Sequence, residues 1–223
     1  EAFTDEDGCR AQTCAPPTPM PIHLDVSLRA GFTFSEDSPL APRSPYSSTK
    51  AGSDLLVQSY ITTFGIDASI TRCCNNFGPR QNSNPPLAGV FPITVNRILQ
   101  NKSPVIEGNG TQSRDFIYVK DVVNVMLEQV TSYEKAPELS KSGIYNLGTG
   151  QARSFVDLGK AVFAALNKTP CFEWVDMPEG LREQYQYFTE ADMSKFRKEL
   201  SATHQFYTLE DGIYEYVKNF FVI

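Results

Sequence analysis

Short apolar segments alternate with amphipathic ones along most of the chain. Runs rich in β-forming residues fall at Ala68–Cys74, Arg114–Val119 and Gly143–Leu147. Each run is short enough to be a buried strand, and helical periodicity lies between the runs. Strands that alternate with helices of this length predict an α/β fold whose sheet has parallel strands.

The predicted helices are bounded by start and stop residues. The clearest begins at Ser44-Pro45, an N-cap followed by proline at the first helical position, and runs to Phe64 before Gly65 ends it. A polar, proline-rich loop from Asn75 to Pro86 comes after the first strand. The remaining helices are expected at about 89–100, Asp121–Val130, Ser154–Leu166, 190–199 and 208–221.

Residues 1–30 differ from the rest of the chain. Cys9, Cys14 and several prolines interrupt any helical or strand period there. We therefore expect this lead to be poorly ordered. Cys9 and Cys14 have the chemistry of metal ligands, but no second Cys/His pair stands nearby, so we expect no metal site.

Composition and charge narrow the class of protein. The chain has 223 residues and a formal net charge of -6, which argues against nucleic acid or an anionic membrane as the main partner. No apolar run approaches the roughly 18–20 residues that span a bilayer. The first residues lack the basic and apolar parts of a signal peptide. Five cysteines without framework spacing suit a reducing compartment, so we expect a cytoplasmic protein.

The sequence Tyr46-Ser-Ser-Thr-Lys50 is the candidate for chemistry, because its spacing places Tyr46 and Lys50 on one helix face. A phenol with an ordinary pKa near 10 is a poor base at neutral pH, and a neighbouring ammonium favours the phenolate. Lys50 also has three donors for a ribose. The pair therefore suits removal of a proton from a sugar hydroxyl while a nicotinamide takes the hydride.

A second pair with the same spacing, Tyr214 and Lys218, lies on the last amphipathic helix. We interpret it as a packing tyrosine and a solvated lysine. The two pairs differ in context, since Tyr46 opens a helix that leads directly into the strand Ala68–Cys74.

Four segments together resemble the extended short-chain dehydrogenase/reductase family, and within it the NAD-dependent nucleotide-sugar epimerases and dehydratases. They are Ser44–Leu56, Thr71–Pro79, Gly108–Val122 and Tyr145–Gly150, in the family's order. The resemblance runs from about Gly31 to the C-terminus. It implies a Rossmann-like, doubly wound parallel sheet, of which this chain has only the C-terminal part, and a smaller α/β substrate-binding domain.

The resemblance also implies a division of the chain and a cofactor site. Residues 31–80 would be the C-terminal part of the dinucleotide-binding domain, and residues 81–223 mainly the nucleotide-sugar domain, with returning elements of the Rossmann sheet. Tyr46 would be the catalytic base, with Lys50 as its partner and as a ligand of the nicotinamide ribose. Cys73 would approach the nicotinamide at the strand end. The expected cofactor is NAD, with NADP as the alternative.

For the substrate, a nucleotide-diphosphate sugar, the resemblance assigns Asn75, Val90, Arg114 and Arg182. Asn75 and Arg114 would bind the diphosphate, for which the fork of donors of a guanidinium is suited. Arg182 stands ten residues before Asp192, the spacing at which 4-epimerases place a second diphosphate-binding arginine. Two alternatives stay open, namely Asn75 as a simple turn residue and Arg114 in a surface ion pair with the next residue, Asp115.

Different segments favour different members of the family. Thr71–Gln81 looks like the dTDP-glucose 4,6-dehydratases. Pro86–Pro92 and Val105–Gly108 are closer to UDP-sugar 4-epimerases, and Met177–Asp192 is similar to the ADP-glyceromannoheptose 6-epimerases. We expect an epimerase, with a 4,6-dehydratase as the alternative.

The family's Gly-rich phosphate turn has no match in this chain. The serine or threonine that accompanies the catalytic tyrosine lies upstream in the family, and Ser27 falls near the expected distance without reproducing the motif. A third hypothesis is therefore an inactive remnant that binds nucleotide sugar or a partner. Family members commonly dimerise through the tyrosine helix and the helix before it, which is not found here, so a homodimer is left open.

Overall fold

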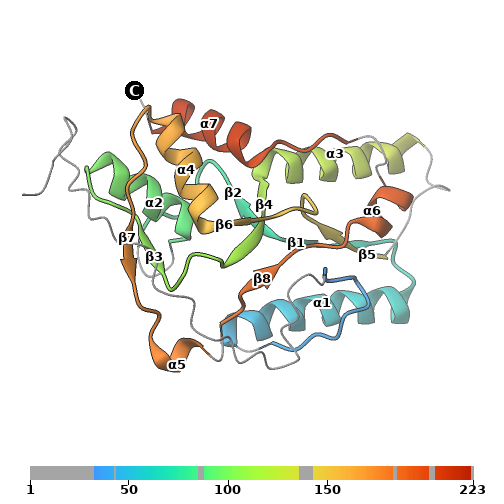
Figure 1. The fold of residues 1–223 in the computed structure, drawn as a ribbon. Helices are drawn as coiled ribbons and strands as arrows, with labels where there is room; N and C mark the ends of the chain where they lie inside the picture. The colour runs from blue at the N-terminus through green and yellow to red at the C-terminus, as the bar shows by residue number, and fades with distance from the viewer. Residues whose placement is uncertain are drawn as a thin grey trace, which may run out of the picture.

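A computed structural model of the chain describes residues 33–42, 44–84, 88–135, 143–182, 185–200 and 204–221. The lead expected at residues 1–30, with Cys9, Cys14 and Ser27, lies outside the described residues. Figure 1 shows the arrangement of the helices and strands.

Helix α1 (Pro45–Phe64) has the bounds that its caps predict. The Ser44 side chain accepts a hydrogen bond from the backbone of Ser47, and Gly65 ends the helix in the left-handed conformation, with φ 63°. Glycine adopts this conformation without the steric cost of a Cβ, which explains why the helix stops there.

The first strands confirm the prediction of parallel pairing. Strand β1 (Ser69–Cys73) pairs in parallel with β5 (Gly143–Leu147), and β2 (Asn75–Phe77) pairs in parallel with β4 (Ser113–Tyr118). Two expectations were wrong. Asn75 begins a strand rather than a loop, and β1 is half-buried at its centre with both ends exposed, instead of fully buried.

Several strands of two or three residues complete the pairing. Strand β3 (Val105–Glu107) pairs in parallel with β7 (Glu173–Val175). Strand β4 also pairs with β6 (Ala152–Ser154), antiparallel, and with β8 (Phe188–Thr189), parallel. The sheet around β4 is therefore mixed, which the sequence pattern did not predict.

The other helices follow the sequence prediction with shifted ends. Helix α3 extends beyond the predicted Asp121–Val130. The helix expected at 190–199 begins only at Ser194, because the backbone before it pairs with Phe34 instead, through a bridge at Ala191. The bounds are α2 Val90–Leu99, α3 Val119–Lys135, α4 Phe155–Ala165, α5 Glu179–Arg182, α6 Ser194–Glu199 and α7 Leu209–Phe220.

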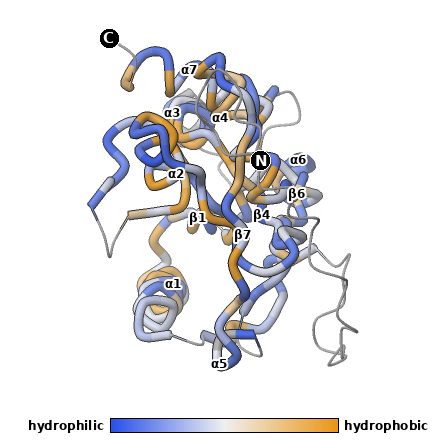
Figure 2. The backbone as a smooth tube through the Cα atoms, turned by 60° about the vertical axis from the view of Figure 1, so that its left-hand side comes forward, coloured by the Kyte–Doolittle hydropathy of each residue, from blue (hydrophilic) through white to orange (hydrophobic). Residues whose placement is uncertain are grey.

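The helices lie on two sides of the strands. In Figures 1 and 2, helices α2, α3, α4 and α7 lie on one side of β1, and α1 and α5 lie on the other. The larger buried cluster, which includes Phe77, Phe91, Tyr118, Val162 and Ile213, joins α2, α4 and α7 to β2 and β4. Helix α1 has no buried residue, so the core is built without it.

A second buried cluster lies on the other face of β4. It includes Ile117, Val122, Leu147 and Phe196, and so joins α3, β5 and α6. Among the described helices, none combines the length and hydropathy that a membrane span needs. Within the same residues there is also no group of three or more His, Cys, Asp or Glu side chains placed to hold a metal ion.

Candidate active site

The Tyr46–Lys50 pair lies in the first turns of α1. Ser44 and Ser47 form a reciprocal capping box, in which the backbone N–H of each residue donates to the side-chain oxygen of the other. This fixes the start of the helix, so that Tyr46 and Lys50 lie on the same side. The Lys50 Nζ atom is 5.5 Å from the centroid of the Tyr46 ring.

Both side chains of this pair are open to solvent, since Tyr46 is 72% exposed and Lys50 is also exposed. Two unit charges 4 Å apart interact by only about 1 kcal/mol in bulk water and by about four times as much near a protein surface. Water therefore screens much of the interaction between Lys50 and the Tyr46 ring. The open phenol is accessible to a sugar hydroxyl.

The pair Tyr214–Lys218 on α7 has nearly the same geometry, with Nζ 5.7 Å from the ring centroid. The internal geometry of a tyrosine–lysine pair thus does not distinguish Tyr46 from Tyr214. The two pairs differ in the elements that follow them. Helix α1 leads through Gly65 into β1 and its end at Cys73, whereas α7 is the last described helix.

At that strand end, Cys73 is exposed and Cys74 is half-buried. The Cys74 backbone N–H donates to Leu147 O at 2.9 Å, which continues the pairing of β1 with β5. Burial raises the pKa of the Cys74 thiol to about 12, and the nearby charges of Asp115 and Cys73 act in the same direction. Cys74 is therefore a neutral thiol at physiological pH and not a nucleophile.

Asn75 and Arg114 project from the same face of the β2–β4 sheet. Asn75 is the register partner of Phe116, which comes two residues after Arg114 in the same strand. Side chains two residues apart share a face of a strand, and register partners on neighbouring strands do so as well. Asn75 is exposed, so its amide is available on this face.

Arg114 lies between two aromatic rings. Its guanidinium carbon is 5.7 Å from the centroid of Phe155 and 5.4 Å from that of Tyr185, and its Nη1 donates to Ser113 O at 2.8 Å. Burial lowers the pKa of Arg114, but an arginine remains charged at neutral pH. None of the ion pairs found among the described residues includes Arg114.

The alternative of an ion pair between Arg114 and Asp115 is wrong. Asp115 is fully buried on the opposite face of β4, where it accepts hydrogen bonds from Thr149 N (2.8 Å), Thr149 Oγ1 (2.6 Å), Gly150 N (3.0 Å) and Ala191 N (3.2 Å). The carboxylate thus joins β4 to the turn after β5 and to the segment after β8. Its neighbour Arg114 is left with its charge available.

Arg182 ends the short helix α5. Its Nε donates to Met177 O at 2.8 Å, and Tyr187 Oη donates to Arg182 O at 3.3 Å. The Tyr187 ring lies 5.3 Å from that of Tyr185, which contacts Arg114. The two tyrosines therefore link the segment of Arg182 to Arg114.

Val90 is the first residue of α2 and is exposed. Gly89 caps this helix without a side-chain hydrogen bond, so backbone N–H groups of the first turn remain available. The structure therefore places Val90 at a helix N-terminus, whose partial positive charge favours an anionic ligand.

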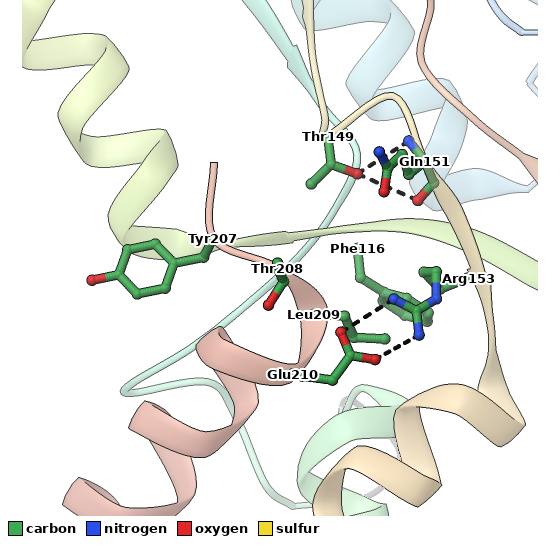
Figure 3. A pocket seen from close by; sticks show the side chains of 8 residues that line it. All are labelled: Phe116, Thr149, Gln151, Arg153, Tyr207, Thr208, Leu209 and Glu210. Atoms are coloured by element: carbon green, nitrogen blue, oxygen red, sulfur yellow. Dashed lines mark hydrogen bonds and ion pairs between the residues drawn. The ribbon is translucent and has the colours of Figure 1, made fainter. Parts of the chain in front are cut away.

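Figure 3 shows a pocket that none of the predicted site residues lines. It lies between the turn after β5 and the start of α7, and its volume is about 100 Å³. The Arg153 guanidinium beside it is paired with Glu210, at 2.6 Å between Nη2 and Oε1. Sites for small-molecule ligands measure about 300–1,000 Å³, so this pocket is too small for a nucleotide sugar.

Sequence reasoning missed the residues that surround Arg114. Phe155 and Tyr185 are far from it in sequence, and Asp115 was considered only as its ion-pair partner. The available signal was the Tyr-Gln-Tyr pattern at 185–187, whose alternation places both tyrosines on one face of an extended segment. Tyr46 and Lys50 lie on a separate element, α1, on the other side of the strands from α2 and α4 (Figure 1).

Comparison with known proteins identifies relatives in sequence. A family model described as the NAD dependent epimerase/dehydratase family matches residues 29–148. The chain is 39% identical over 159 residues to an ADP-L-glycero-D-manno-heptose-6-epimerase of Fusobacterium nucleatum. This alignment covers 66% of this chain and 46% of that protein. It is 38% identical over 156 residues to the low-salt glycan biosynthesis protein Agl12 of Haloferax volcanii, covering 68% and 46% of the two chains.

Solved structures confirm the Rossmann-like fold. A UDP-N-acetylglucosamine 4-epimerase from Methanobrevibacter ruminantium M1 matches with a TM-score of 0.71 and 29% identity, covering 86% of this chain and 58% of that one. A dTDP-glucose 4,6-dehydratase from Bacillus anthracis, in complex with NAD, matches with a TM-score of 0.68 and 27% identity. The match covers 86% of this chain and 56% of that one.

This chain therefore spans about half the length of the relatives it matches. The family model covers more than half of the chain, and its segment includes the tyrosine–lysine pair of α1, Asn75 and Arg114. The chain thus belongs to the NAD-dependent epimerase/dehydratase family of enzymes.

Proposed function

We propose that this chain carries the catalytic tyrosine and the substrate side of an NAD-dependent nucleotide-sugar epimerase. The observation that carries the proposal is Arg114, a cation held between two aromatic rings and without a carboxylate partner among the described residues. A half-buried guanidinium in this state has its charge available for an anion, and its planar fork matches the oxygens of a diphosphate.

Other groups support a diphosphate at this place. The Asn75 amide lies on the same face of the sheet as Arg114, and Tyr185 and Tyr187 connect Arg114 to the segment of Arg182. In the reaction proposed here, Asn75, Arg114 and Arg182 hold the diphosphate. Val90 at the start of α2 borders the nucleotide.

The chemical step belongs to Tyr46 and Lys50. The phenol removes a hydroxyl proton from the sugar, and the ammonium of Lys50 stabilises the phenolate while its donors hold the nicotinamide ribose. NAD held beside Lys50 would supply the hydride acceptor and donor for this exchange. Tyr46 would hold the proton while the sugar is in the keto state and return it to the sugar oxygen afterwards.

The residues present fit the nicotinamide end of NAD. Tyr46 is exposed beside Lys50, and the strand end at Cys73 is also exposed, so both are accessible to a ring and its ribose. The family is NAD-dependent. NADP remains the alternative cofactor, because the residues that select between the two belong to the half of the relatives that this chain does not span.

A 4,6-dehydratase is the second candidate. Thr71–Gln81 resembles these enzymes, and a dTDP-glucose 4,6-dehydratase of an Actinoplanes species is 43% identical over 89 residues. The two reactions share the removal of the proton by Tyr46. They differ in the product, since the dehydratase eliminates water and the epimerase gives an isomer of equal mass. Mass spectrometry of the product, formed by an active enzyme that includes this chain, distinguishes them.

Calorimetry with UDP-, ADP- and dTDP-sugars tests the binding part of the proposal. We expect Arg114→Gln to weaken binding of the preferred nucleotide sugar by about 10–100-fold, the range for a lost hydrogen bond to a charged group. The control is Arg197→Gln, because Arg197 is an exposed arginine on α6, and we expect its Kd to stay within about twofold. Equal effects of the two substitutions, or no binding by the unsubstituted chain, would contradict the proposal.

A further inference from the structure

One guanidinium contacts both ends of the stretch that carries Tyr46. Arg72, in β1, donates from Nε to Asp54 Oδ2 at 2.7 Å and from Nη1 to Glu36 O at 2.8 Å. Glu36 comes before Tyr46 in the sequence, and Asp54 comes after it within α1. A single side chain of the sheet therefore holds the stretch from Glu36 to Asp54 at its two ends.

The contact with Asp54 attaches α1 to β1. No residue of this helix is buried, and of the ion pairs found among the described residues only Arg72–Asp54 joins α1 to a strand. The side chains of Arg72 and Asp54 are 21% and 9% exposed, so salt screens this pair less than a surface pair. Since a helix has a regular geometry, fixing Asp54 also fixes Lys50 and Tyr46, which lie about one turn and about two turns before it.

The contact with Glu36 belongs to a group of hydrogen bonds on two neighbouring strands. Asn146, the register partner of Arg72 in β5, donates from its backbone N–H to Glu36 Oε1 at 2.8 Å and from Nδ2 to Phe34 O at 2.6 Å. The backbone of Phe34 also pairs with residues 190–192, at 2.9 Å in both hydrogen bonds. The segment of Phe34 and Glu36 is therefore anchored on the sheet, and Arg72 connects this anchor to α1.

We propose that Arg72 is a positioning residue, which joins the two ends of the stretch from Glu36 to Asp54 and so sets the place of Tyr46 relative to the end of β1. This inference rests on the proposed function, in which Tyr46 removes the proton and the nicotinamide lies at that strand end. Arg72 directly precedes Cys73, the last residue of β1, so the strand that ends at the expected nicotinamide site also holds the helix of Tyr46. A misplacement of reacting groups by about 1 Å can cost about 100-fold in rate.

A purely structural role is the competing interpretation, and Arg97 provides the comparison for it. Its Nε donates to Ser103 O at 2.7 Å, and its Nη2 donates to Glu173 Oε2 at 2.8 Å. Arg97 therefore has one carbonyl and one carboxylate partner, as Arg72 has, but it joins α2 to β7. Arg97→Gln is the matched control for Arg72→Gln.

The first test measures hydrogen exchange of the chain without ligand, followed by peptide mass spectrometry. We expect Arg72→Gln to speed exchange at least about tenfold both in residues 34–38 and in α1, the range for loss of hydrogen bonds to a charged group. Arg97→Gln should leave the exchange of both segments unchanged. Unchanged exchange of either segment in Arg72→Gln would overturn the proposal.

A second variant, Asp54→Asn, covers the case in which Arg72→Gln does not fold. Arg72 keeps its hydrogen bond to Glu36 O in this variant, but it loses the carboxylate of α1. We therefore expect faster exchange in α1, with residues 34–38 still protected. An α1 that exchanges as slowly as in the unsubstituted chain would count against Arg72 as the group that holds this helix.

The second test separates positioning from stability through single-turnover rates with NAD and the nucleotide sugar. We expect Arg72→Gln to slow the chemical step by about 10–100-fold, while the Kd of the nucleotide sugar stays within about threefold. In a Tyr46→Phe background the same substitution should change the rate by less than about twofold, because Arg72 acts through Tyr46. Effects that multiply in the double variant, or an equal loss of rate in Arg97→Gln, would show a structural role instead.

The two tests keep failure of this inference apart from failure of the proposed function. Hydrogen exchange needs neither substrate nor cofactor, so it decides whether Arg72 holds both segments even in a chain that turns nothing over. A chain without turnover, or a Tyr46→Phe variant as fast as the unsubstituted chain, would contradict the proposed function and not the contacts of Arg72.

Discussion

At Gly148 the surrounding packing leaves no room for a Cβ atom. A Cβ atom built there would lie 2.3 Å from Asp115 Oδ2 and 3.0 Å from the Cβ of Ala191. We predict that Gly148→Ala lowers the free energy of unfolding by about 1–3 kcal/mol, because Asp115 must move and give up hydrogen bonds to the turn at Thr149 and Gly150. Urea denaturation followed by circular dichroism measures this change.

Gly52 provides the matched control for that substitution. It lies inside α1, and no atom comes within 4 Å of a Cβ built there. Alanine is the better helix former by about 0.8–1.0 kcal/mol, so Gly52→Ala should stabilise the helix. If both substitutions destabilised the chain alike, the close approach of Asp115 to Gly148 would not be the cause.

At the residue scale, the similar pairs Tyr46–Lys50 and Tyr214–Lys218 allow a test of which tyrosine is the base. We predict that Tyr46→Phe lowers kcat by about 10²–10⁴-fold, the range for loss of a general acid–base group, while the Kd of the nucleotide sugar changes by less than about threefold. Tyr214→Phe, which keeps the ring beside Lys218, should leave both unchanged. Single-turnover assays with NAD present measure the chemical step, and comparable losses in the two variants would count against Tyr46 as the base.

At the scale of elements, α1 depends on few interactions with the rest of the molecule. Its Asp54 accepts hydrogen bonds from Arg72 Nε and Gln58 Nε2. Burial alone would raise the pKa of Asp54, but these hydrogen bonds and the charge of Arg72 outweigh burial and lower it. The ionised form of Asp54 is therefore the form that stabilises the attachment of α1 to β1.

The sign of this shift predicts a response to acid. A carboxyl whose pKa is lower in the folded state contributes stability above its unfolded pKa, near 3.9 for aspartate, and loses it as the pH falls through the folded value. We predict that the attachment of α1 weakens below about pH 4. The NMR signal of Arg72 Nε–H reports it, and Asp54→Asn should remove the pH dependence and cost about 1–3 kcal/mol. A signal that is unchanged in acid would contradict the assignment.

The elements also show what the sequence can predict. The bounds of α1 and β5 were predicted correctly, because the capping serines, Gly65 and the apolar run Gly143–Leu147 are local signals. The strands β6 and β8 were missed, since two or three residues carry no periodicity and both strands form by pairing with β4.

The candidate site likewise has a part that the sequence predicts and a part that only the folded structure shows. Tyr46, Lys50 and Arg114 were found from motifs, whereas the rings that hold Arg114 come from distant segments. Phe155 lies in α4 and Tyr185 lies just before β8, so only the fold brings them to one guanidinium. The family resemblance could indicate that Arg114 binds a diphosphate, but no local pattern could predict its aromatic surroundings.

At the scale of the whole molecule, the two buried clusters exclude α1. Val162 and Ile213 in α4 and α7 are fully buried, whereas α1 has no buried residue. Regions with few buried apolar contacts open at lower free energy than the core. We predict that in native-state hydrogen exchange the amides of α1 exchange well before those of α4. Equal protection of the two helices would show that α1 unfolds together with the core.

The alternation of Arg114 and Asp115 in β4 separates two roles within one strand. Asp115, on one face, joins three segments of the fold, while Arg114, on the other, keeps its charge available. Because neighbouring side chains point in opposite directions, replacing Arg114 disturbs no hydrogen bond of Asp115. Evolution could therefore change the anion that this strand recognises at little cost in folding, whereas a change at Asp115 would be removed by selection before its effect on the ligand mattered.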